Sequence, residues 1–586
     1  MKASARAALS ILLASAIVLA ISALSAAAPS YLDVKSIKAG MSGYGLTVFK
    51  GTEPERFDFT VIAVTKGDGG LSDLILVRVS GKNMELSGGI AAGMSGSPCY
   101  ISDKLVGALS HVLEGPDSDY GIITPMAEMV KVLEAGKLAS SPVRIELVGY
   151  GSFVQAATPI WVSGLNERAL SGLTAKLSAK GIALAPLPAL VQGLTTIGKP
   201  DFKAGSAVAV QVSYGGIEAG ALGTLTWTDG RSFLAFGHPF MSLGSVEIPM
   251  SQSEVLAVLP SNGFPFKMGT FEKPTATVTE DRTTAIAGVI GTAPAMVDVS
   301  VKVTDMQTGR KREASFKAIP DARVLADLVS SAALSVCDSA LMRVGEGTSY
   351  LSILIEAAGK RMLREDMVWS GNDVAAEVTM EVADMIAILM KNDVEEPSIG
   401  SIEIILDIAP ARLTAVIAGI ELPEEGFTPG VPARLAVMLR PFRAEVYTRY
   451  VEVTIPEGSP AGKIEVYVRG GSSEEESETV GIYDKLGKTG GLGIAELLAK
   501  LETSDQNNGL IIEIRYIEKY GQQPGYEEGA PEADDTAEEA QNPSFAVDQS
   551  DEGYDFYDEA DEPYHTEMVL VQRVVSGSAS GISQVR

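Results

Sequence analysis

The sequence has few of the residues that carry metal-binding and redox chemistry. It contains two cysteines, Cys99 and Cys337, and three histidines among 586 residues. Two cysteines are too few for a disulfide framework, and they lack the spacing and the neighbouring histidines of a zinc site. We therefore expect no metal, and we interpret both thiols as buried small apolar groups, with a single disulfide as the alternative.

Long apolar runs are also missing after residue 28. Before it, Lys2 and Arg6 are followed by the apolar run LSILLASAIVLAISAL and by small residues. This layout is typical of a secretory signal. We expect residues 1–28 to be a signal peptide and the rest to be extracytoplasmic, whether periplasmic, secreted or membrane-anchored facing outward. An uncleaved anchor is the alternative, because the run approaches the roughly 20 residues that span a bilayer. Only then is a membrane expected as a partner.

Basic residues are absent from one long stretch near the C-terminus. Residues 521–564 contain fifteen Asp and Glu and no Lys or Arg, so about half of the net charge of −28 lies there. Such a composition cannot bury enough apolar surface to fold, and we expect residues 521–566 to be an acidic disordered segment. The absence of EF-hand spacing argues against calcium binding. The absence of basic patches argues against nucleic acid as a partner.

The length and the patterning predict several domains. Short alternating apolar runs separated by glycine indicate antiparallel strands in the N-terminal half. We expect the following order: signal or anchor, 1–28; nucleophile-bearing β-barrel, 29–142; strand–helix–strand insert with Asn166 as helix N-cap, 143–200; histidine-bearing β-barrel, 201–319; mixed α/β region, 320–397; β-sandwich module with a short helix at 491–501, 398–520; acidic segment, 521–566; C-terminal strand and tail, 567–586.

The hexapeptide Gly93-Met94-Ser95-Gly96-Ser97-Pro98 is the most informative in the chain. A serine between glycines on a tight loop can expose its hydroxyl, and the Gly93 and Ser95 amides can point at a developing oxyanion. A simple turn between strands is the alternative. A serine nucleophile needs a base, and histidine is the usual one. His565 borders the acidic segment, which leaves His111 and His238.

The segment 86–126 resembles the nucleophile region of the SpoIVB-type serine peptidases, where GGI, GMSGSP, a short hairpin, G-A-x-x-H-V and Y-G-I follow in this order. The resemblance implies that Ser95 is the nucleophile and Ser97 a loop residue. A strand GTLTW leading into LAFGH resembles the family's histidine segment, which implies that His238 is the base and His111 a structural neighbour. A turn histidine is the alternative for His238.

The order of these segments departs from the family, because the serine precedes the histidine here. The resemblance therefore implies a mainly β fold in which two chymotrypsin-like barrels have exchanged places along the chain. A catalytic triad is defined by geometry, so the two barrels must pack face to face. The Ser95 hydroxyl is then expected about 3 Å from the His238 ring.

The third member of the triad is not evident. The family's acid lies shortly before GGI, where Val79-Ser80-Gly81 has none. Asp73 is the nearest upstream acid and the candidate, with a strand-entry role as the alternative. Asp229 fits better as a hairpin residue, given its Asp-Gly dipeptide. A Ser–His dyad stays open.

These features together predict an exported serine endopeptidase that cleaves another extracytoplasmic protein or peptide and needs no cofactor. A catalytically inactive scaffold or binding protein of the cell envelope, built on the same fold, is the alternative. The missing acid and the long C-terminal extension favour it.

Overall fold

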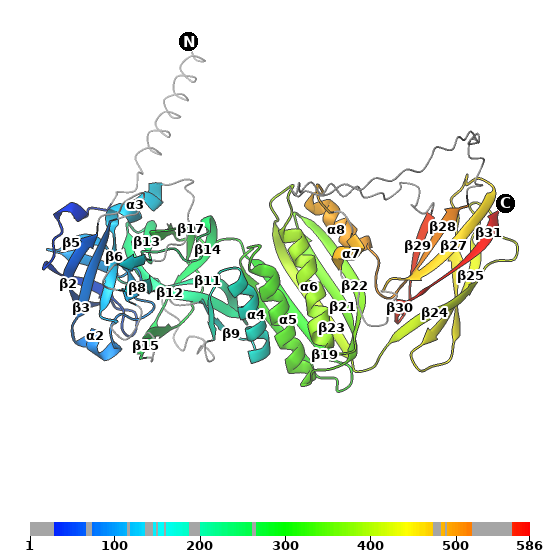
Figure 1. Ribbon diagram of the computed structural model, residues 1–586, viewed down its shortest axis with the longest axis horizontal. Coiled ribbons are helices and arrows are strands. Elements are labelled where there is room, and N and C mark those ends of the chain that lie inside the picture. Colours follow the sequence, from blue (N-terminus) through cyan, green and yellow to red (C-terminus); the bar gives the residue numbers. More distant parts are fainter. Residues whose placement is uncertain are drawn as a thin grey trace, which may run out of the picture.

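A computed structural model describes residues 29–65, 73–113, 118–134, 145–147, 151–156, 160–186, 200–260, 265–472, 482–486, 489–517 and 565–586. Three parts follow one another along the long axis: two packed barrels, a helix-covered sheet and a β-sandwich (Figure 1). The predicted signal peptide or anchor and nearly all of the predicted acidic segment lie outside the described residues.

The first barrel closes six antiparallel strands in the order β4-β1-β2-β3-β6-β5, with β4 and β5 completing the ring. Strand β2 alternates inward apolar and outward polar side chains, whereas β5 and β6 are buried along most of their length. Phe57, Phe59 and Val61 of β2, for example, are buried. The strands are β1 (Ser42–Thr47), β2 (Glu55–Thr65), β3 (Leu74–Ser80), β4 (Pro98–Ile101), β5 (Lys104–Leu113) and β6 (Tyr120–Pro125).

Short elements surround this barrel. They are η1 (Val34–Ser36), α2 (Lys82–Ser87), α3 (Met126–Glu134), β7 (Ile145–Leu147) and β8 (Gly151–Gln155), of which β8 extends the sheet from β5. Helix α3 also contacts strands of the second barrel, so its apolar face helps to join the two.

The second barrel closes in the order β12-β13-β18-β17-β14-β11, with β11 and β12 completing the ring. The expected Asp229-Gly230 hairpin is present: Gly230 has φ +88°, and Asp229 accepts bonds from two backbone amides of the turn. The strands are β11 (Ala207–Gly215), β12 (Glu218–Thr228), β13 (Ser232–Ala235), β14 (Gly244–Gln252), β17 (Ala276–Arg282) and β18 (Ala285–Ile290), and a separate hairpin is formed by β15 (Val255–Leu259) and β16 (Phe266–Gly269). The predicted double-barrel fold, with the serine barrel first, is confirmed.

The expected strand–helix–strand insert is β9 (Ile160–Ser163), α4 (Glu167–Ala179) and β10 (Leu184–Pro186). Asn166 caps α4 as predicted, since its side chain accepts a bond from the Ala169 amide at 2.8 Å. The unit is not separate from its surroundings. Strand β9 pairs with β12 of the second barrel, and α4 packs on α5 of the next part.

The sheet of the second barrel continues into the α/β part through β20, which pairs with both β11 and β19. The five strands run in the order β20-β19-β23-β21-β22, and helices α5 and α6 cover one face. These elements are β19 (Val297–Asp305), β20 (Lys311–Ala318), α5 (Leu325–Leu341), β21 (Gly347–Ala357), β22 (Lys360–Ser370), α6 (Val374–Met390) and β23 (Ile399–Ala409).

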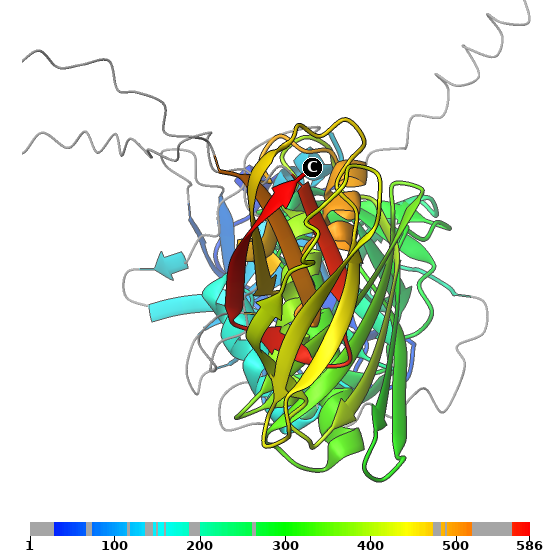
Figure 2. The same cartoon turned by 90° about the vertical axis from the view of Figure 1, so that its right-hand side faces the viewer.

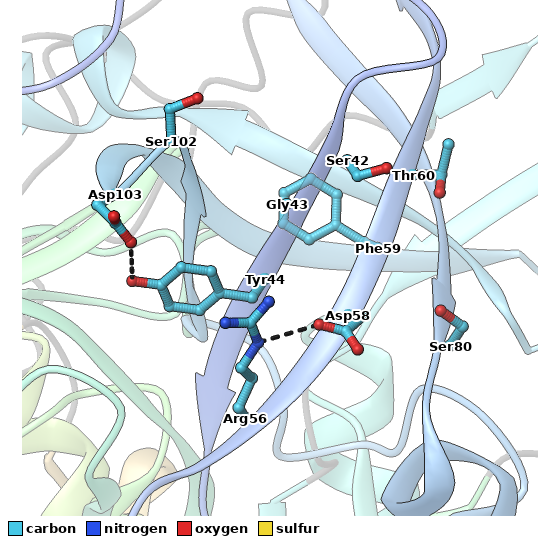
Figure 3. A pocket seen from close by; sticks show the side chains of 10 residues that line it. All are labelled: Ser42, Gly43, Tyr44, Arg56, Asp58, Phe59, Thr60, Ser80, Ser102 and Asp103. Carbon is cyan, nitrogen blue, oxygen red and sulfur yellow. Dashed lines mark hydrogen bonds and ion pairs between the residues drawn. The ribbon is translucent and has the colours of Figure 1, made fainter.

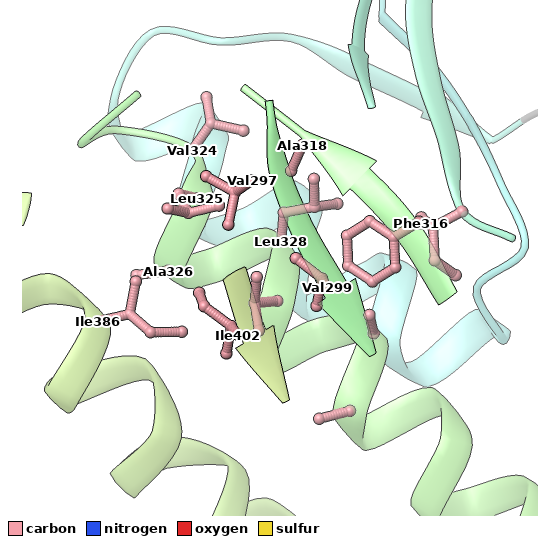
Figure 4. Packing of buried hydrophobic residues seen from close by; sticks show 14 of the residues in the cluster. Val297, Val299, Phe316, Ala318, Val324, Leu325, Ala326, Leu328, Ile386 and Ile402 are labelled. Carbon is pink, nitrogen blue, oxygen red and sulfur yellow. The ribbon is translucent and has the colours of Figure 1, made fainter. Parts of the chain in front are cut away.

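Packing in this part follows the apolar faces of the helices. Figure 4 shows Leu325 and Leu328 of α5 and Ile386 of α6 pointing onto Val299 of β19 and Ile402 of β23. All five side chains are buried in the largest apolar cluster of the chain. Alternate residues of the strands thus face the helices, which is the arrangement that a sheet covered on one side requires.

Two sheets form the C-terminal sandwich, which lies nearest the viewer in Figure 2. One has the order β26-β25-β24-β30 and the other β29-β28-β27-β31, with an apolar core between them. The strands are β24 (Thr414–Glu421), β25 (Ala433–Pro441), β26 (Tyr447–Val453), β27 (Gly462–Gly470), β28 (Gly509–Tyr516), β29 (His565–Leu570), β30 (Val574–Ser576) and β31 (Ser578–Val585).

The structure divides the C-terminal half differently from the expectation. Strands β19 and β20 belong to the α/β sheet rather than to the histidine barrel alone, and β23 belongs to that sheet rather than to the sandwich. The short helix is α8 (Ile494–Thr503), which packs with α7 (Ile482–Leu486) on the α/β part. Three strands, not one, follow residue 564. Alternating patterns identify strands but do not say which sheet a strand joins.

A buried arginine anchors α8 to β22. Arg364 is fully buried and donates to the Leu501 carbonyl at 2.8 Å, to Ser504 and Asp505, and to Asp366 Oδ2 at 2.6 Å. These bonds satisfy the last carbonyls of the helix, which have no partner within it.

Both Cys99 and Cys337 are free and buried, as interpreted from the sequence. Burial raises the pKa of each thiol.

We predict that Arg364→Met destabilises the α/β part by about 3–5 kcal/mol, because the buried Asp366 would lose its close ion pair and keep only Lys485, at 4.0 Å, while the Leu501 carbonyl would lose its donor. Urea-dependent hydrogen exchange of peptides from α8 and β22 measures the change. Arg361→Met is the matched control, since Arg361 lies on the same strand with an exposed side chain. Equal effects of the two substitutions would contradict the prediction.

Candidate active site

The loop that carries Ser95 is held by its own backbone. The Met94 amide donates to Ala91 at 2.9 Å, and Ser97 Oγ donates to the Met94 carbonyl at 2.6 Å. Gly93 and Gly96 both have left-handed backbones, with φ of +94° and +92°. Side chains with a Cβ rarely adopt this conformation, so the two glycines allow the tight turn that presents the serine.

This loop lies directly against β12 of the second barrel. The Thr224 amide donates to the Ser95 carbonyl at 2.8 Å, and Thr226 Oγ1 donates to the Gly96 carbonyl at 2.8 Å. A Cβ on Gly96 would lie 1.9 Å from the Thr224 carbonyl oxygen and 2.5 Å from the Phe236 amide. The absence of a side chain at residue 96 is therefore what lets the two barrels approach.

His238 follows a second strained turn, in which Phe236 and Gly237 have φ of +70° and +72°. Thr124 of the first barrel donates to the Gly237 carbonyl at 2.7 Å and fixes this turn. His238 Nδ1 lies 2.7 Å from the Pro239 carbonyl oxygen, which can only accept. Nδ1 therefore carries the proton, and Nε2 has a free lone pair. Burial lowers the pKa of His238 to about 4.

The two barrels thus bring the Ser95 and His238 segments to one interface, but the two side chains are not hydrogen-bonded. Both residues have no exposed surface, and neither Ser95 Oγ nor His238 Nε2 has a hydrogen-bond partner among the described residues. The expected hydroxyl–imidazole bond is absent in this closed arrangement. Buried polar atoms without partners are costly, so the packing around them must impose this arrangement.

The expected oxyanion donors are only partly available. The Gly93 amide donates to the Ala156 carbonyl at 3.1 Å, so it does not point freely at a substrate. The Ser95 amide has no backbone acceptor in the part of the chain that the structure describes. Of the two predicted donors, the Gly93 amide is therefore occupied, and the Ser95 amide is unoccupied as far as the described residues go.

Neither acid considered from the sequence bonds the imidazole. The Pro239 carbonyl occupies the Nδ1 position that a triad acid would take. Asp73 lies at the entrance to β3, and Asp229 lies in its hairpin. His111 lies beside the site instead, with its ring 6.2 Å from that of His238 and Nδ1 2.8 Å from Ser110 Oγ. Burial, and to a smaller extent the charge interaction with His238, lower the pKa of His111 to about 3.

A comparison with family models identifies the segment that contains this loop. Residues 28–130 match the SpoIVB peptidase S55 family. The match confirms the resemblance read from the sequence, and it covers the serine barrel up to α3. It does not extend to His238. No curated protein and no solved structure matches the chain.

The S55 segment also contains a polar pocket away from Ser95. Its volume is about 460 Å³, and its walls include Tyr44, whose hydroxyl points to Asp103, and Arg56, which pairs with Asp58 (Figure 3). Neither Ser95 nor His238 lines it. No group of metal-binding side chains and no helix suited to crossing a membrane occurs among the described residues.

Two charged residues near the Ser95 and His238 segments were missed from the sequence. The first is Asp281 of β17, which has no exposed surface and accepts bonds from the amides of Phe240, Met241 and Leu243 at 2.7, 2.8 and 3.1 Å. Burial raises the pKa of Asp281, and the three amides oppose this shift. Two adjacent acids, Glu280 and Asp281, lie in the strand ATVTEDR, and successive side chains of a strand point to opposite faces, so one acid had to point inward; this was the available signal.

The second is Lys267 of β16, whose aliphatic stem packs on the loop that carries Ser95. A Cβ on Gly93 would lie 3.2 Å from the Lys267 side chain, and Lys267 Nζ donates to Thr47 Oγ1 at 2.6 Å. Thr47 lies 3.4 Å from Thr224 Oγ1, which donates to the Gly93 carbonyl. Burial alone lowers the pKa of Lys267 to about 7. The available signal was a lysine between two large apolar residues, Phe266 and Met268, although strand alternation alone does not predict that it is buried.

We predict that Gly96→Ala disrupts the contact between the barrels, because its Cβ would collide with the Thr224 carbonyl. Gly230→Ala is the matched control, since Gly230 has a similar φ of +88° but open space around its Cβ position. The control should lose only the roughly 1–2 kcal/mol of a left-handed backbone. Urea unfolding of both variants measures the difference, and equal losses would contradict the clash.

We predict that burial of Lys267 makes stability rise with pH. Between about pH 7 and 10.5 the folded lysine is neutral while the unfolded lysine is charged, so the unfolded state binds more protons and unfolding becomes harder as pH rises. Below pH 7 both states are charged, and the full cost remains. Lys267→Met should abolish this dependence in urea unfolding between pH 7 and 10, whereas Lys104→Met, at an exposed site, should retain it.

Proposed function

We propose that this chain is a serine peptidase with Ser95 as nucleophile and His238 as general base. The observation that carries the proposal is the pair of unpartnered buried atoms, Ser95 Oγ and His238 Nε2, at the interface of two barrels. The S55 match over the serine barrel supports the reaction class. An unprotonated Nε2 is the form that can accept a proton.

In the proposed reaction, Ser95 Oγ forms a bond to the peptide carbonyl carbon while its proton moves to His238 Nε2. The carbonyl oxygen becomes an oxyanion, which the Ser95 amide stabilises. The Gly93 amide joins it once its bond to Ala156 is released. The protonated imidazole then donates its proton to the leaving amine, and water hydrolyses the acyl group by the same route in reverse.

A peptide can reach Ser95 only after the closed site opens, because neither Ser95 nor His238 is exposed. Site opening that completes the catalytic contacts is a common device in hydrolases. We propose that the substrate is another protein or peptide outside the cytoplasm. That location rests on the signal-like pattern of residues 1–28, which was read from the sequence alone.

The second candidate is an inactive scaffold or binding protein of the cell envelope. The occupied Gly93 amide and the missing Ser95–His238 bond favour it. Both are features of the closed arrangement, so the two candidates differ in whether Ser95 ever becomes reactive.

We predict that a fluorophosphonate probe labels the wild-type protein and that Ser95→Ala abolishes labelling, because the probe needs an activated hydroxyl. Ser97→Ala should still be labelled, more slowly, because Ser97 Oγ only holds the loop through Met94. Intact-mass spectrometry measures the adduct. Labelling that survives Ser95→Ala would reject this nucleophile, and an unlabelled wild type would support the scaffold.

A further inference from the structure

Asp281 and His238 are joined through one peptide group. The Phe240 amide donates to Asp281 Oδ1 at 2.7 Å, and the Pro239 carbonyl oxygen lies 2.7 Å from His238 Nδ1. This amide and this carbonyl belong to the same Pro239–Phe240 peptide bond. The carboxylate and the imidazole therefore lie at the two ends of a single planar unit.

The direction of each hydrogen bond in this chain is fixed. A carbonyl oxygen can only accept, so His238 Nδ1 donates to Pro239, and a backbone amide can only donate, so Phe240 donates to the carboxylate. The negative carboxylate attracts the amide hydrogen and polarises the whole peptide group. The carbonyl oxygen of that same peptide group becomes more negative as a result. The carbonyl thereby becomes a better acceptor for the imidazole.

We propose that Asp281 is the positioning acid of the Ser95–His238 pair and acts on the imidazole through the Pro239–Phe240 peptide. The inference rests on the proposed peptidase function. A triad acid holds the histidine in the correct tautomer and orientation and stabilises the imidazolium that forms. Asp281 supplies the tautomer, the orientation and the stabilisation of the imidazolium through the intervening peptide group, without touching the ring.

Two further bonds make the carboxylate a rigid anchor. Asp281 Oδ2 accepts from the Met241 and Leu243 amides, so the loop that follows His238 is tied to β17 at three points. The anchor explains why this chain can lack an acid ahead of GGI. The acid comes from the histidine barrel, where it holds the base, rather than from the serine barrel.

The hydrogen-bond partners of Asp281 fit its ionised form, because all three are backbone N–H donors. Burial raises the pKa of Asp281 above its ordinary value, and the three amides and Arg323 oppose that rise without cancelling it. His111 is the titratable group beside His238. Glu280, the neighbouring acid on β17, bonds Ser245 and Arg282 instead of the loop.

The test uses the full chain labelled with 15N-histidine, which gives ring signals from only three residues. In the wild type at pH 7, His238 should show a protonated Nδ1 and a bare Nε2. Asp281→Asn should shift the Nδ1 signal or mix the two tautomers, while Glu280→Gln should leave the His238 signals in place. A wild-type His238 protonated at Nε2 would overturn the proposal without any variant being needed.

Probe labelling at pH 7 supplies the second readout. We predict that Asp281→Asn lowers the labelling rate on the order of 10–100-fold, the cost usual for a partner that orients a functional histidine. Glu280→Gln should have little effect. Unchanged rates and unchanged His238 signals in Asp281→Asn would overturn the role of Asp281. Labelling that survives Ser95→Ala would instead reject the proposed nucleophile, which keeps the two failures distinct.

Discussion

The close approach of the Gly96 backbone to Thr224 is the contact on which the rest of the site depends. It needs a residue without a side chain at position 96, because a Cβ would lie 1.9 Å from the Thr224 carbonyl oxygen. With that approach, the Thr224 amide binds the Ser95 carbonyl and the Phe236 turn lies against the serine loop. Each barrel therefore completes the surroundings of a residue carried by the other, and the Ser95 and His238 segments meet at one interface although the serine comes first in the chain.

The closed site stores polar groups at a cost in stability. Ser95 Oγ and His238 Nε2 are buried without partners, and Lys267 has an amine with one hydroxyl to bond. Such groups persist only where the surrounding packing imposes them, and they are concentrated at functional sites. Asp281 and Lys267 differ in how well their buried groups are satisfied. Asp281 accepts bonds from three backbone amides, whereas no ionised partner affects the pKa of Lys267.

Local patterns predicted the parts of the fold that local physics decides. The Asn166 cap, the Asp229-Gly230 hairpin and the glycine-flanked serine loop each follow from short-range conformational preferences. The S55 resemblance added the double barrel. Strand β23 and residue Asp281 could not be placed, because sheet membership and the loop that an acid will bind depend on contacts between distant segments. Likewise, nothing in GMSGSP indicates that Ala156 will occupy the Gly93 amide.

Strand β20 joins the second barrel to the helix-covered sheet. It pairs with β11 of the histidine barrel on one side and with β19 on the other, so a single run of backbone hydrogen bonds crosses from one part into the next. Cutting the chain after the second barrel would strip a partner from β11, the strand that closes the ring with β12. The seam therefore makes the barrels and the helix-covered sheet a unit that genetic recombination can exchange only as a whole.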